Sequence, residues 1–350
     1  MINIKVIKKG ERLFVNTLNP TTVEGKELII LSGGKTMGHV TPLIAIYEHY
    51  KNRFSFLYFG LKDSMEEREC CKRNIPFFAL DLLPFYRKNL LKNYHTFKKI
   101  NKEKKRISEK LKTAKIRAIF TSGGFVSIPV VLASRTFKCK KILFEANAIM
   151  GLANKWLSLY VDMVITQFDI NSKYFNLGYP ILNNQKPSLD LSFFYQKKPL
   201  LLFVGGSNGA LEIVKFAYQF HLDNPNINCV ILTGNRYYDL YDLNNNAIKF
   251  KRIENVSSIF KYFNVIVSRS GGATISELFS TGSKAVLIPS RNVVGDHQYH
   301  NAINLKEYQN FKVALDYEEM KNAITDLLSN DKKTIKKNFD YNILDNYLNV

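Results

Sequence analysis

Residues 31–42 read Leu-Ser-Gly-Gly-Lys-Thr-Met-Gly-His-Val-Thr-Pro directly after the apolar run Leu28-Ile29-Ile30, and residues 204–210 read Val-Gly-Gly-Ser-Asn-Gly-Ala directly after Leu200-Leu201-Leu202-Phe203. Each stretch is typical of a buried strand that ends in glycines and turns into a helix. Such a turn presents free backbone N–H groups and the positive end of a helix dipole, which suits a phosphate or another anion. Two such units, one in each half of the chain, predict two similar α/β domains that face one cleft.

Apolar strand candidates alternate with helical patterns through both halves, as in parallel sheets covered by helices on both faces. The fold class expected is α/β, with two Rossmann-like, doubly wound parallel-sheet domains. The expected strands are Glu27–Leu31, Phe54–Phe59, Phe77–Asp81, Ala118–Thr121, Lys141–Phe144, Met163–Thr166, Leu200–Val204, Cys229–Thr233, Ile248–Lys251, Val265–Ser268 and Ala285–Ile288. The expected helices include 42–50, 64–73, 97–113, 127–135, 208–221 and 272–281.

The length of 350 residues exceeds the usual size of one domain and favours two. The break is expected near residues 177–180, before a polar stretch at 183–188 that has the composition of a linker. The domains are therefore expected at 28–178 and 179–350, with the C-terminal helix able to return to the first domain. Residues 1–27 carry no motif and are treated as an N-terminal extension of unknown role.

The formal net charge of +20 is unevenly distributed. Residues 1–178 hold 31 Lys and Arg against 14 Asp and Glu, whereas residues 179–350 hold 19 against 16. The densest stretch, 82–117, contains thirteen basic residues and two glutamates. Basic and apolar side chains together are typical of a surface that binds anionic lipid headgroups. The candidate membrane patch is Phe85, Tyr86, Leu90, Leu91, Lys98 and Lys99.

Two other interpretations of this basic stretch are a solvated basic helix and a nucleic-acid surface; no recognisable nucleic-acid module accompanies the charge, so nucleic acid is disfavoured as a partner. No stretch approaches the roughly 18 apolar residues of a membrane span, and the N-terminus lacks the pattern of a signal peptide. We therefore expect a cytoplasmic protein, peripheral on the inner face of the cell membrane. The four cysteines show no paired C-x-x-C spacing and are interpreted as free thiols.

Several nucleotide-binding templates fail. A Walker A loop ending in Gly34-Lys35-Thr36 would need glycine where Ile29 stands. The dinucleotide fingerprint G-x-G-x-x-G is broken in both halves, so an NAD enzyme is disfavoured. The stretch 205–209 has the letters of a hydrolase nucleophile elbow, but a hydrolase would also need a later acid and histidine in suitable loops.

A third glycine-containing segment, 267–277, again ends a strand and begins a helix. Glu277 falls in the first turns of that helix, where its carboxylate could accept hydrogen bonds from ribose hydroxyls. The polar cluster 296–301 follows, and its amide and imidazole groups suit sugar hydroxyls. Each feature alone could be a helix cap; together, at the ends of strands in one domain, they favour a sugar-nucleotide site.

These residues resemble the MurG enzymes of glycosyltransferase family 28, from about Leu28 to Leu305. The resemblance rests on five blocks in the family's order: Gly33-Gly-Lys-Thr-Met-Gly-His39, Ser122-Gly-Gly-Phe-Val-Ser-Ile-Pro129, Glu145-Ala-Asn-Ala-Ile-Met-Gly-Leu-Ala-Asn-Lys155, Gly205-Gly-Ser-Asn-Gly-Ala210, and Ser268-Arg-Ser-Gly-Gly-Ala-Thr-Ile-Ser-Glu277 with Gln298. It implies the two-domain GT-B fold and inverting transfer of N-acetylglucosamine from UDP-GlcNAc to undecaprenyl-pyrophosphoryl-N-acetylmuramoyl-pentapeptide.

The resemblance also implies site residues and partners. The donor is expected to contact Thr36, Met37, Gly38, Asn147, Ser207, Ile253, Gly272, Ala273, Thr274, Ile275, Ser276, Glu277 and Gln298. The first domain is expected to offer the site for the lipid-linked acceptor, next to the basic and aromatic patch. UDP-GlcNAc is then a substrate and no cofactor is implied. No D-x-D pair occurs, so a metal-clamped diphosphate is unsupported.

His39 and Glu145 are the candidate catalytic residues. An imidazole is largely neutral at cytoplasmic pH, so His39 could remove the proton from the acceptor hydroxyl. The competing interpretation is a structural histidine that caps its loop. The helix N-termini after Gly206 and Gly271 would assist departure of UDP.

Four segments depart from the family pattern. Phe144-Glu-Ala-Asn147 stands for His-Glu-Gln-Asn, Phe125 for a tyrosine, Lys35 for a glycine, and Gly178-Tyr-Pro-Ile-Leu182 for Gly-Asn-Pro-Val/Ile-Arg. Loss of that arginine removes an expected contact to the nucleotide. Three hypotheses remain: a divergent MurG-like enzyme, a glycolipid synthase that uses diacylglycerol, and an inactive scaffold of the cell-wall machinery.

Overall fold

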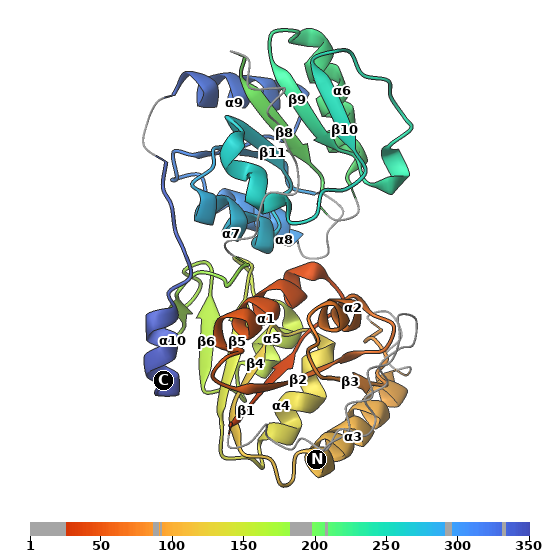
Figure 1. Ribbon diagram of the computed structural model, residues 1–350, viewed down its shortest axis with the longest axis vertical. Helices are drawn as coiled ribbons and strands as arrows, with labels where there is room; N and C mark the ends of the chain where they lie inside the picture. Colours follow the sequence, from red (N-terminus) through yellow and green to blue (C-terminus); the bar gives the residue numbers. More distant parts are fainter. Residues whose placement is uncertain are drawn as a thin grey trace.

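A computed structural model describes residues 26–86, 91, 93–182, 198–206, 209–290, 296–330 and 334–350. It has two α/β units, one above the other in Figure 1. The expected linker at 183–188, Leu90, Ser207 and residues 1–25 of the N-terminal extension lie outside the described residues.

The lower unit in Figure 1 alternates strands and helices from Leu28 to Asn176. Its strands are β1 (Leu28–Ser32), β2 (Ser55–Leu61), β3 (Phe77–Leu80), β4 (Ile116–Thr121), β5 (Lys140–Glu145), β6 (Met163–Thr166) and β7 (Phe175–Asn176). Its helices are α1 (Met37–Tyr50), α2 (Met65–Lys72), α3 (Asn93–Lys110), the 3₁₀ turn η2 (Phe125–Ser127), α4 (Ile128–Ser134) and α5 (Leu152–Leu157).

The upper unit repeats this alternation. Its strands are β8 (Leu200–Val204), β9 (Asn228–Leu232), β10 (Ala247–Phe250), β11 (Val265–Ser268), β12 (Ala285–Leu287) and β13 (Phe311–Val313). Its helices are α6 (Leu211–Asp223), η4 (Asn235–Tyr237), η5 (Val256–Tyr262), α7 (Gly272–Thr281), α8 (His297–Ile303) and α9 (Tyr317–Ser329). A last helix, α10 (Tyr341–Leu348), ends the chain.

Within the described residues, the strand orders are β3-β2-β1-β4-β5-β6-β7 and β10-β9-β8-β11-β12-β13, and the neighbouring strands pair in parallel. Both orders reverse beside the first strand of the unit, which is the doubly wound arrangement. The fold class predicted from the sequence is therefore confirmed. The strands β7 and β13 were not expected, because two or three residues are too few to form a recognisable alternating pattern.

Alternate residues of the first strand in each sheet enter different cores. Ile29 and Leu31 pack with α1, whereas Leu28 and Ile30 pack on the face covered by α3 and α4. In the second sheet, Leu201 and Phe203 pack with α6 and α9, and the intervening residues pack with α7 and η5. Burial on both faces explains why these strands are continuous apolar runs.

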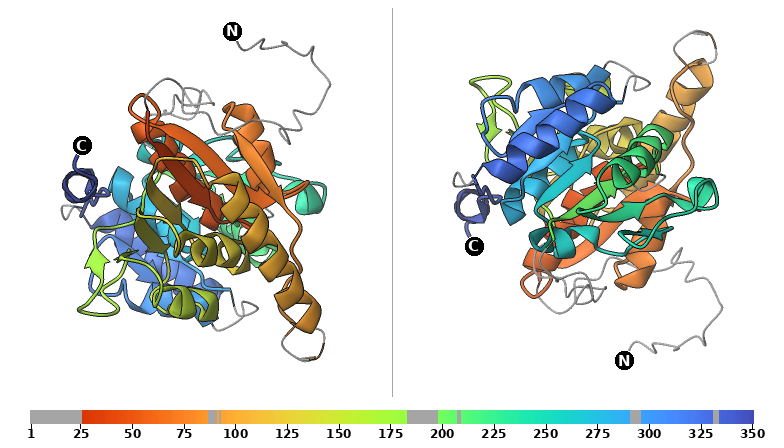
Figure 2. Two further views of the ribbon diagram at one scale, coloured as in Figure 1. Left: turned by 90° about the horizontal axis from the view of Figure 1, so that it is seen from below. Right: turned by 90° about the horizontal axis from the view of Figure 1, so that it is seen from above.

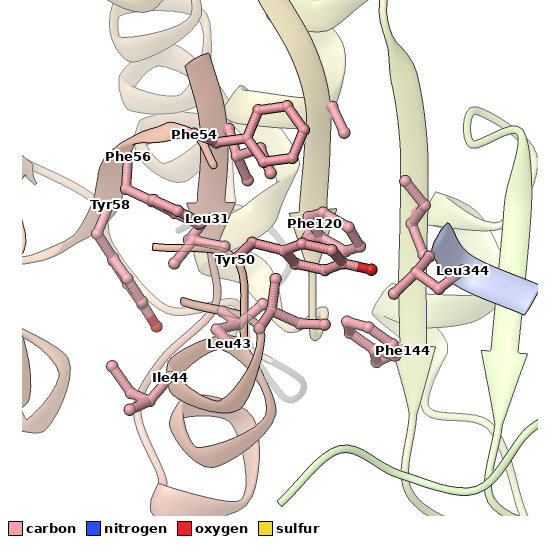
Figure 3. Close-up of a cluster of buried hydrophobic side chains, with 14 of the residues drawn as sticks. Leu31, Leu43, Ile44, Tyr50, Phe54, Phe56, Tyr58, Phe120, Phe144 and Leu344 are labelled. Atoms are coloured by element: carbon pink, nitrogen blue, oxygen red, sulfur yellow. The ribbon is translucent and has the colours of Figure 1, made fainter. Parts of the chain in front are cut away.

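Helix α10 packs on the first unit, although the chain has already passed through the second (Figure 1). Leu344 lies close to Phe144 and Tyr50 in the first core (Figure 3). The Tyr50 hydroxyl donates to Asp345 Oδ1 at 2.6 Å, and the His49 ring stacks on Tyr341 with centroids 3.8 Å apart. The chain therefore connects the two units twice, which restricts how they can move apart. Among the described residues, no helix has the length and apolar character needed to cross a membrane.

Candidate active site

A cleft of about 1230 Å³ lies between the two units and is lined by both. The loops that enter it follow β1 in the first sheet and β8 and β11 in the second, with α1 and α7 beginning at its walls. In doubly wound sheets, ligands bind at the carboxyl ends of strands where the strand order reverses. The topology therefore places the glycine-rich loops at the position where each sheet can bind a ligand.

Nine of the residues expected to contact a donor line this cleft. From the first unit they are Thr36, Met37 and Gly38, and from the second they are Ile253, Gly272, Ala273, Thr274, Glu277 and Gln298. Asn147, Ile275 and Ser276 are not among its lining residues, and neither are His39 and Glu145. Ile275 is fully buried in the core of the second unit.

The helices α1 and α7 begin on opposite walls of the cleft and contact each other (Figure 1). Neither N-cap residue, Thr36 or Gly271, provides a side-chain hydrogen bond to its helix. The backbone N–H groups at both helix starts can therefore bind a ligand, and both dipoles favour an anion. This geometry suits a diphosphate bound between the two units.

The first glycine loop is held by Glu66, a fully buried carboxylate on α2 that the sequence analysis did not single out. Its oxygens accept from the backbone N–H groups of Leu61 at 3.1 Å and Lys35 at 3.3 Å. A Cβ at Gly34 would lie 2.2 Å from Glu66 Oε1, so this approach requires glycine. Lys35 adopts φ +75°, a left-handed conformation that favours glycine.

His39 lies in the first turn of α1 and is fixed by the segment that follows β4. Its Nδ1 is 2.7 Å from the carbonyl oxygen of Ser122, and the Ser122 hydroxyl donates to the His39 carbonyl at 2.6 Å. Because a carbonyl only accepts, the neutral ring carries its proton on Nδ1. Nε2 is then the nitrogen that can accept a proton, as a general base requires.

Glu145, the other candidate catalytic residue, ends β5 and is buried. Its Oε1 accepts from the backbone N–H and the side-chain amide of Asn147, both at 3.0 Å. Its Oε2 accepts from the Asn154 amide at 2.8 Å and the Gly151 N–H at 3.3 Å. Four donors occupy this carboxylate, so we reassign Glu145 from a reacting group to a residue that positions its loop.

Asn147 and Ser276, expected as donor contacts, make hydrogen bonds between the two units. Asn301 of α8, which the sequence analysis did not single out individually, donates to Asn147 Oδ1 at 3.1 Å and accepts from the Ala148 N–H at 2.8 Å. Ser276 donates to Gln167 Oε1 at 2.8 Å. A Cβ at Gly272 would lie 2.5 Å from the Ala146 carbonyl oxygen. Gly272 thus lets the start of α7 approach the first unit.

Glu277 presents the contrasting case. It lines the cleft, and its carboxyl group makes no hydrogen bond to a residue that the structure describes. Burial raises the pKa of this carboxyl group to about 7, because the charged form loses its hydration. Hydroxyl groups of a bound ligand would supply the missing donors. The Gln298 side chain also lines the cleft and accepts from the Ser290 N–H at 2.9 Å.

The departures from the family pattern have identifiable positions. Leu182 lines the cleft, so an apolar side chain stands where the family has arginine. Tyr179 is buried and donates from its hydroxyl to the Gly38 carbonyl at 2.8 Å, which ties the segment before the linker to α1. Phe144 is fully buried, and its ring stacks with that of Phe120 at a centroid distance of 5.9 Å (Figure 3). Phe144 therefore belongs to the core and not to the cleft.

The candidate membrane patch lies where α3 begins. Phe85, Tyr86 and Leu91 are exposed, and Tyr94 and Phe97 add two exposed aromatic side chains that the sequence analysis did not include. Both views of Figure 2 show this end of α3 projecting beyond the other helices of its unit. Lys98 is exposed, whereas Lys99 Nζ contacts Asp81 Oδ1 at 2.5 Å. The described residues contain no group of three or more His, Cys, Asp or Glu side chains that could hold a metal ion.

Two family models match the chain. The glycosyltransferase family 28 N-terminal domain matches residues 29–166, and the glycosyltransferase family 28 C-terminal domain matches residues 200–344. The first match falls on the first unit. The second match covers the second unit and the start of α10, as far as Leu344.

Curated relatives include "UDP-N-acetylglucosamine--N-acetylmuramyl-(pentapeptide) pyrophosphoryl-undecaprenol N-acetylglucosamine transferase" of Bacillus licheniformis, which is 31% identical over 88% of this chain and 92% of the relative. The protein of that name from Lactobacillus johnsonii is 29% identical over 80% and 83%. Acinetobacter baumannii MurG has a similar solved structure, with a TM-score of 0.68 at 20% identity, covering 93% of this chain and all of that one. The calicheamicin glycosyltransferase CalG4 gives a TM-score of 0.64 at 14% identity, covering 88% and 91%. These likenesses confirm the GT-B fold.

Proposed function

The chain belongs to glycosyltransferase family 28, and from that premise we propose that it transfers N-acetylglucosamine from UDP-GlcNAc to undecaprenyl-pyrophosphoryl-N-acetylmuramoyl-pentapeptide. The product is the disaccharide lipid precursor of peptidoglycan. The observation that carries the proposal is the cleft, in which the start of α1 faces the start of α7 and Glu277. These parts match the needs of a nucleoside diphosphate sugar: dipoles for the diphosphate and an open carboxylate for hydroxyl groups.

The reaction is a displacement at the anomeric carbon of the sugar. The acceptor hydroxyl forms the new C–O bond, its proton passes to Nε2 of His39, and UDP departs with the electrons of the broken bond. The Ser122 carbonyl holds His39 in the tautomer that this transfer needs. The N–H groups at the starts of α1 and α7 stabilise the charge that develops on the diphosphate. Attack from the face opposite the departing UDP inverts the anomeric configuration.

The acceptor side of the proposal assigns the first unit to the lipid-linked substrate and to the inner face of the cytoplasmic membrane. Exposed Phe85, Tyr86 and Leu91 support it, together with the excess of basic residues over acidic ones in this half of the chain. Apolar side chains can enter the headgroup region while lysines attract anionic lipids, each contributing on the order of 1 kcal/mol. A reaction on a membrane-bound acceptor requires that the enzyme have a surface able to bind the membrane.

A transfer assay tests the proposed reaction. Radiolabelled UDP-GlcNAc is supplied with a short-chain lipid-linked muramoyl-pentapeptide. Diacylglycerol as the acceptor and UDP-glucose as the donor are run in parallel. We expect labelled product on the muramoyl lipid alone. Product only on diacylglycerol would instead identify a glycolipid synthase, and UDP binding with no product on either acceptor would favour an inactive scaffold.

Sedimentation with anionic vesicles tests the membrane assignment. Replacement of Lys98, Lys99, Lys104 and Lys105 by glutamine should weaken binding several-fold at low salt, because each lysine near the surface adds attraction. The matched control replaces four lysines of the second half, Lys261, Lys306, Lys321 and Lys336, and so makes the same change in net charge. Equal losses in the two variants would mean that net charge, and not this surface, governs binding.

A further inference from the structure

Four cationic side chains line the cleft within the described residues: Lys72, Arg73, Lys251 and Arg252. Two of them are already paired with carboxylates. Lys72 Nζ lies 2.9 Å from Glu69 Oε1, and Arg73 contacts Glu69 as well as Glu48, the latter at 3.7 Å. The Arg73–Glu48 pair links the end of α2 to α1, and together the ion pairs leave little of either positive charge for a ligand.

The other two cations are neighbours on the loop between β10 and η5. The Lys251 ammonium lies over the ring of Tyr238, 4.8 Å from its centroid. Arg252 is exposed, and it makes no hydrogen bond, ion pair or ring contact with a described residue. Among the cleft cations of the described chain, Arg252 therefore has its guanidinium available for a ligand.

The charge of the cleft favours a role for such a cation. Glu48, Glu69, Glu254 and Glu277 line the same space and oppose the four cations, so the lining has little excess positive charge. A diphosphate brings at least two negative charges. The starts of α1 and α7 contribute only partial charges. Leu182, which lines the cleft as well, contributes none.

We propose that Arg252 binds the diphosphate of the nucleotide donor, an assignment that rests on the proposed function. A guanidinium can donate two parallel hydrogen bonds to phosphate oxygens, which fixes orientation in addition to charge. Arg252 adjoins Ile253, which lines the cleft and is one of the expected donor contacts, so one short loop holds both residues at the cleft. Arg252 is thus a donor-binding residue that supplies the cation missing at Leu182.

The test is calorimetric titration of UDP, UMP and uridine into the full-length chain carrying Arg252→Gln, Arg252→Lys or Lys251→Gln. Arg252→Gln should weaken UDP binding about tenfold or more, in the range of a charge-assisted bidentate contact. Uridine binding should change less than about twofold. The UDP affinity of Arg252→Lys should lie between those of Arg252→Gln and the parent, because lysine keeps the positive charge and lacks the paired N–H donors of the guanidinium. Lys251→Gln, which removes the neighbouring charge of the same cleft and keeps the guanidinium, should weaken UDP binding less than Arg252→Gln does.

A second arm adds Leu182→Arg to Arg252→Gln, which returns a guanidinium to the same cleft from the opposite unit. Partial recovery of UDP affinity is expected. Equal UDP affinities for Arg252→Gln, Lys251→Gln and the parent would overturn the assignment and leave the proposed function intact. An effect confined to the KM for the lipid-linked acceptor would also overturn it. A parent chain that binds no UDP would overturn both the proposed function and this assignment.

Discussion

The two walls of the cleft differ in how the polar side chains that line them, or lie next to the lining residues, are engaged. Next to the first wall, His39 and Glu145, which do not themselves line the cleft, are hydrogen-bonded to their own unit, and Asn147, also outside the lining, is bonded both to Glu145 and across to Asn301. On the second unit, the Glu277 carboxyl group and the Arg252 guanidinium face the cleft without a hydrogen bond to the described residues. The first wall is a preorganised scaffold, whereas the second presents charged groups that a ligand must satisfy.

This difference assigns different tasks to the walls. A reacting group needs a fixed geometry, so a base held by the Ser122 carbonyl suits the side where chemistry begins. A binding wall gains affinity when its unsatisfied groups find partners on the ligand. Substitutions on the first wall should therefore affect stability and turnover, and substitutions on the second should affect donor affinity.

The largest effect is expected from Glu145→Ala, which leaves four N–H donors, one of them buried and three partly buried, without their acceptor. The free energy of unfolding should fall by about 3 kcal/mol or more, measured by chemical denaturation. Glu145→Gln should lower the free energy of unfolding less than Glu145→Ala does. Its amide keeps one oxygen that accepts hydrogen bonds, although its NH2 group then faces two of the donors. Glu109→Ala, at an exposed glutamate of α3, is the matched control and should change stability by less than about 0.5 kcal/mol. Unchanged stability with lost turnover would restore Glu145 to a reacting role.

His39→Ala comes next and should lower turnover by at least roughly tenfold with donor affinity little changed, measured by steady-state rates and by UDP titration. His39→Gln distinguishes a base from a structural cap. Its amide can still donate to the Ser122 carbonyl, but it has no nitrogen that accepts a proton. Turnover restored by glutamine would remove His39 from the mechanism.

The smallest effect concerns pH and the second wall. The pKa of Glu277 is raised to about 7 by burial, and hydrogen bonds from donor hydroxyls would favour the ionised form and lower that pKa on binding. UDP affinity should therefore rise several-fold between pH 6 and pH 8, with release of a proton that calorimetry in two buffers can detect. Glu277→Gln should remove the pH dependence. A parent chain whose affinity is flat across this range would contradict a role for Glu277 in binding hydroxyls.

The sequence predicted the fold correctly because both sheets are buried on two faces. Continuous apolar runs such as Leu28–Leu31 and Leu200–Val204 can satisfy their side chains only in a covered parallel sheet. The glycine loops after these strands predicted the position of the cleft, because local backbone geometry determines where each helix starts. The short strands β7 and β13 escaped notice because their few residues are set by neighbouring strands.

What the sequence by itself determined about this protein is its local chemistry: the strand-to-glycine-to-helix turns, the asymmetry of charge between the two halves, and the residue types available to a sugar nucleotide. Only the tertiary structure decided which of these groups are already engaged. Glu145 and Glu277 are both carboxylates close to a strand end or a helix start, yet one accepts four hydrogen bonds and the other accepts none from the described chain. The partners of Glu145 follow it closely in the chain, but Ser122 and Asn301 acquire their roles from contacts across more than 80 residues, and Arg252 acquires its role from its place in the lining of the cleft. A side chain's reactivity depends on its neighbours in space, and those neighbours are set by the packing of the two units.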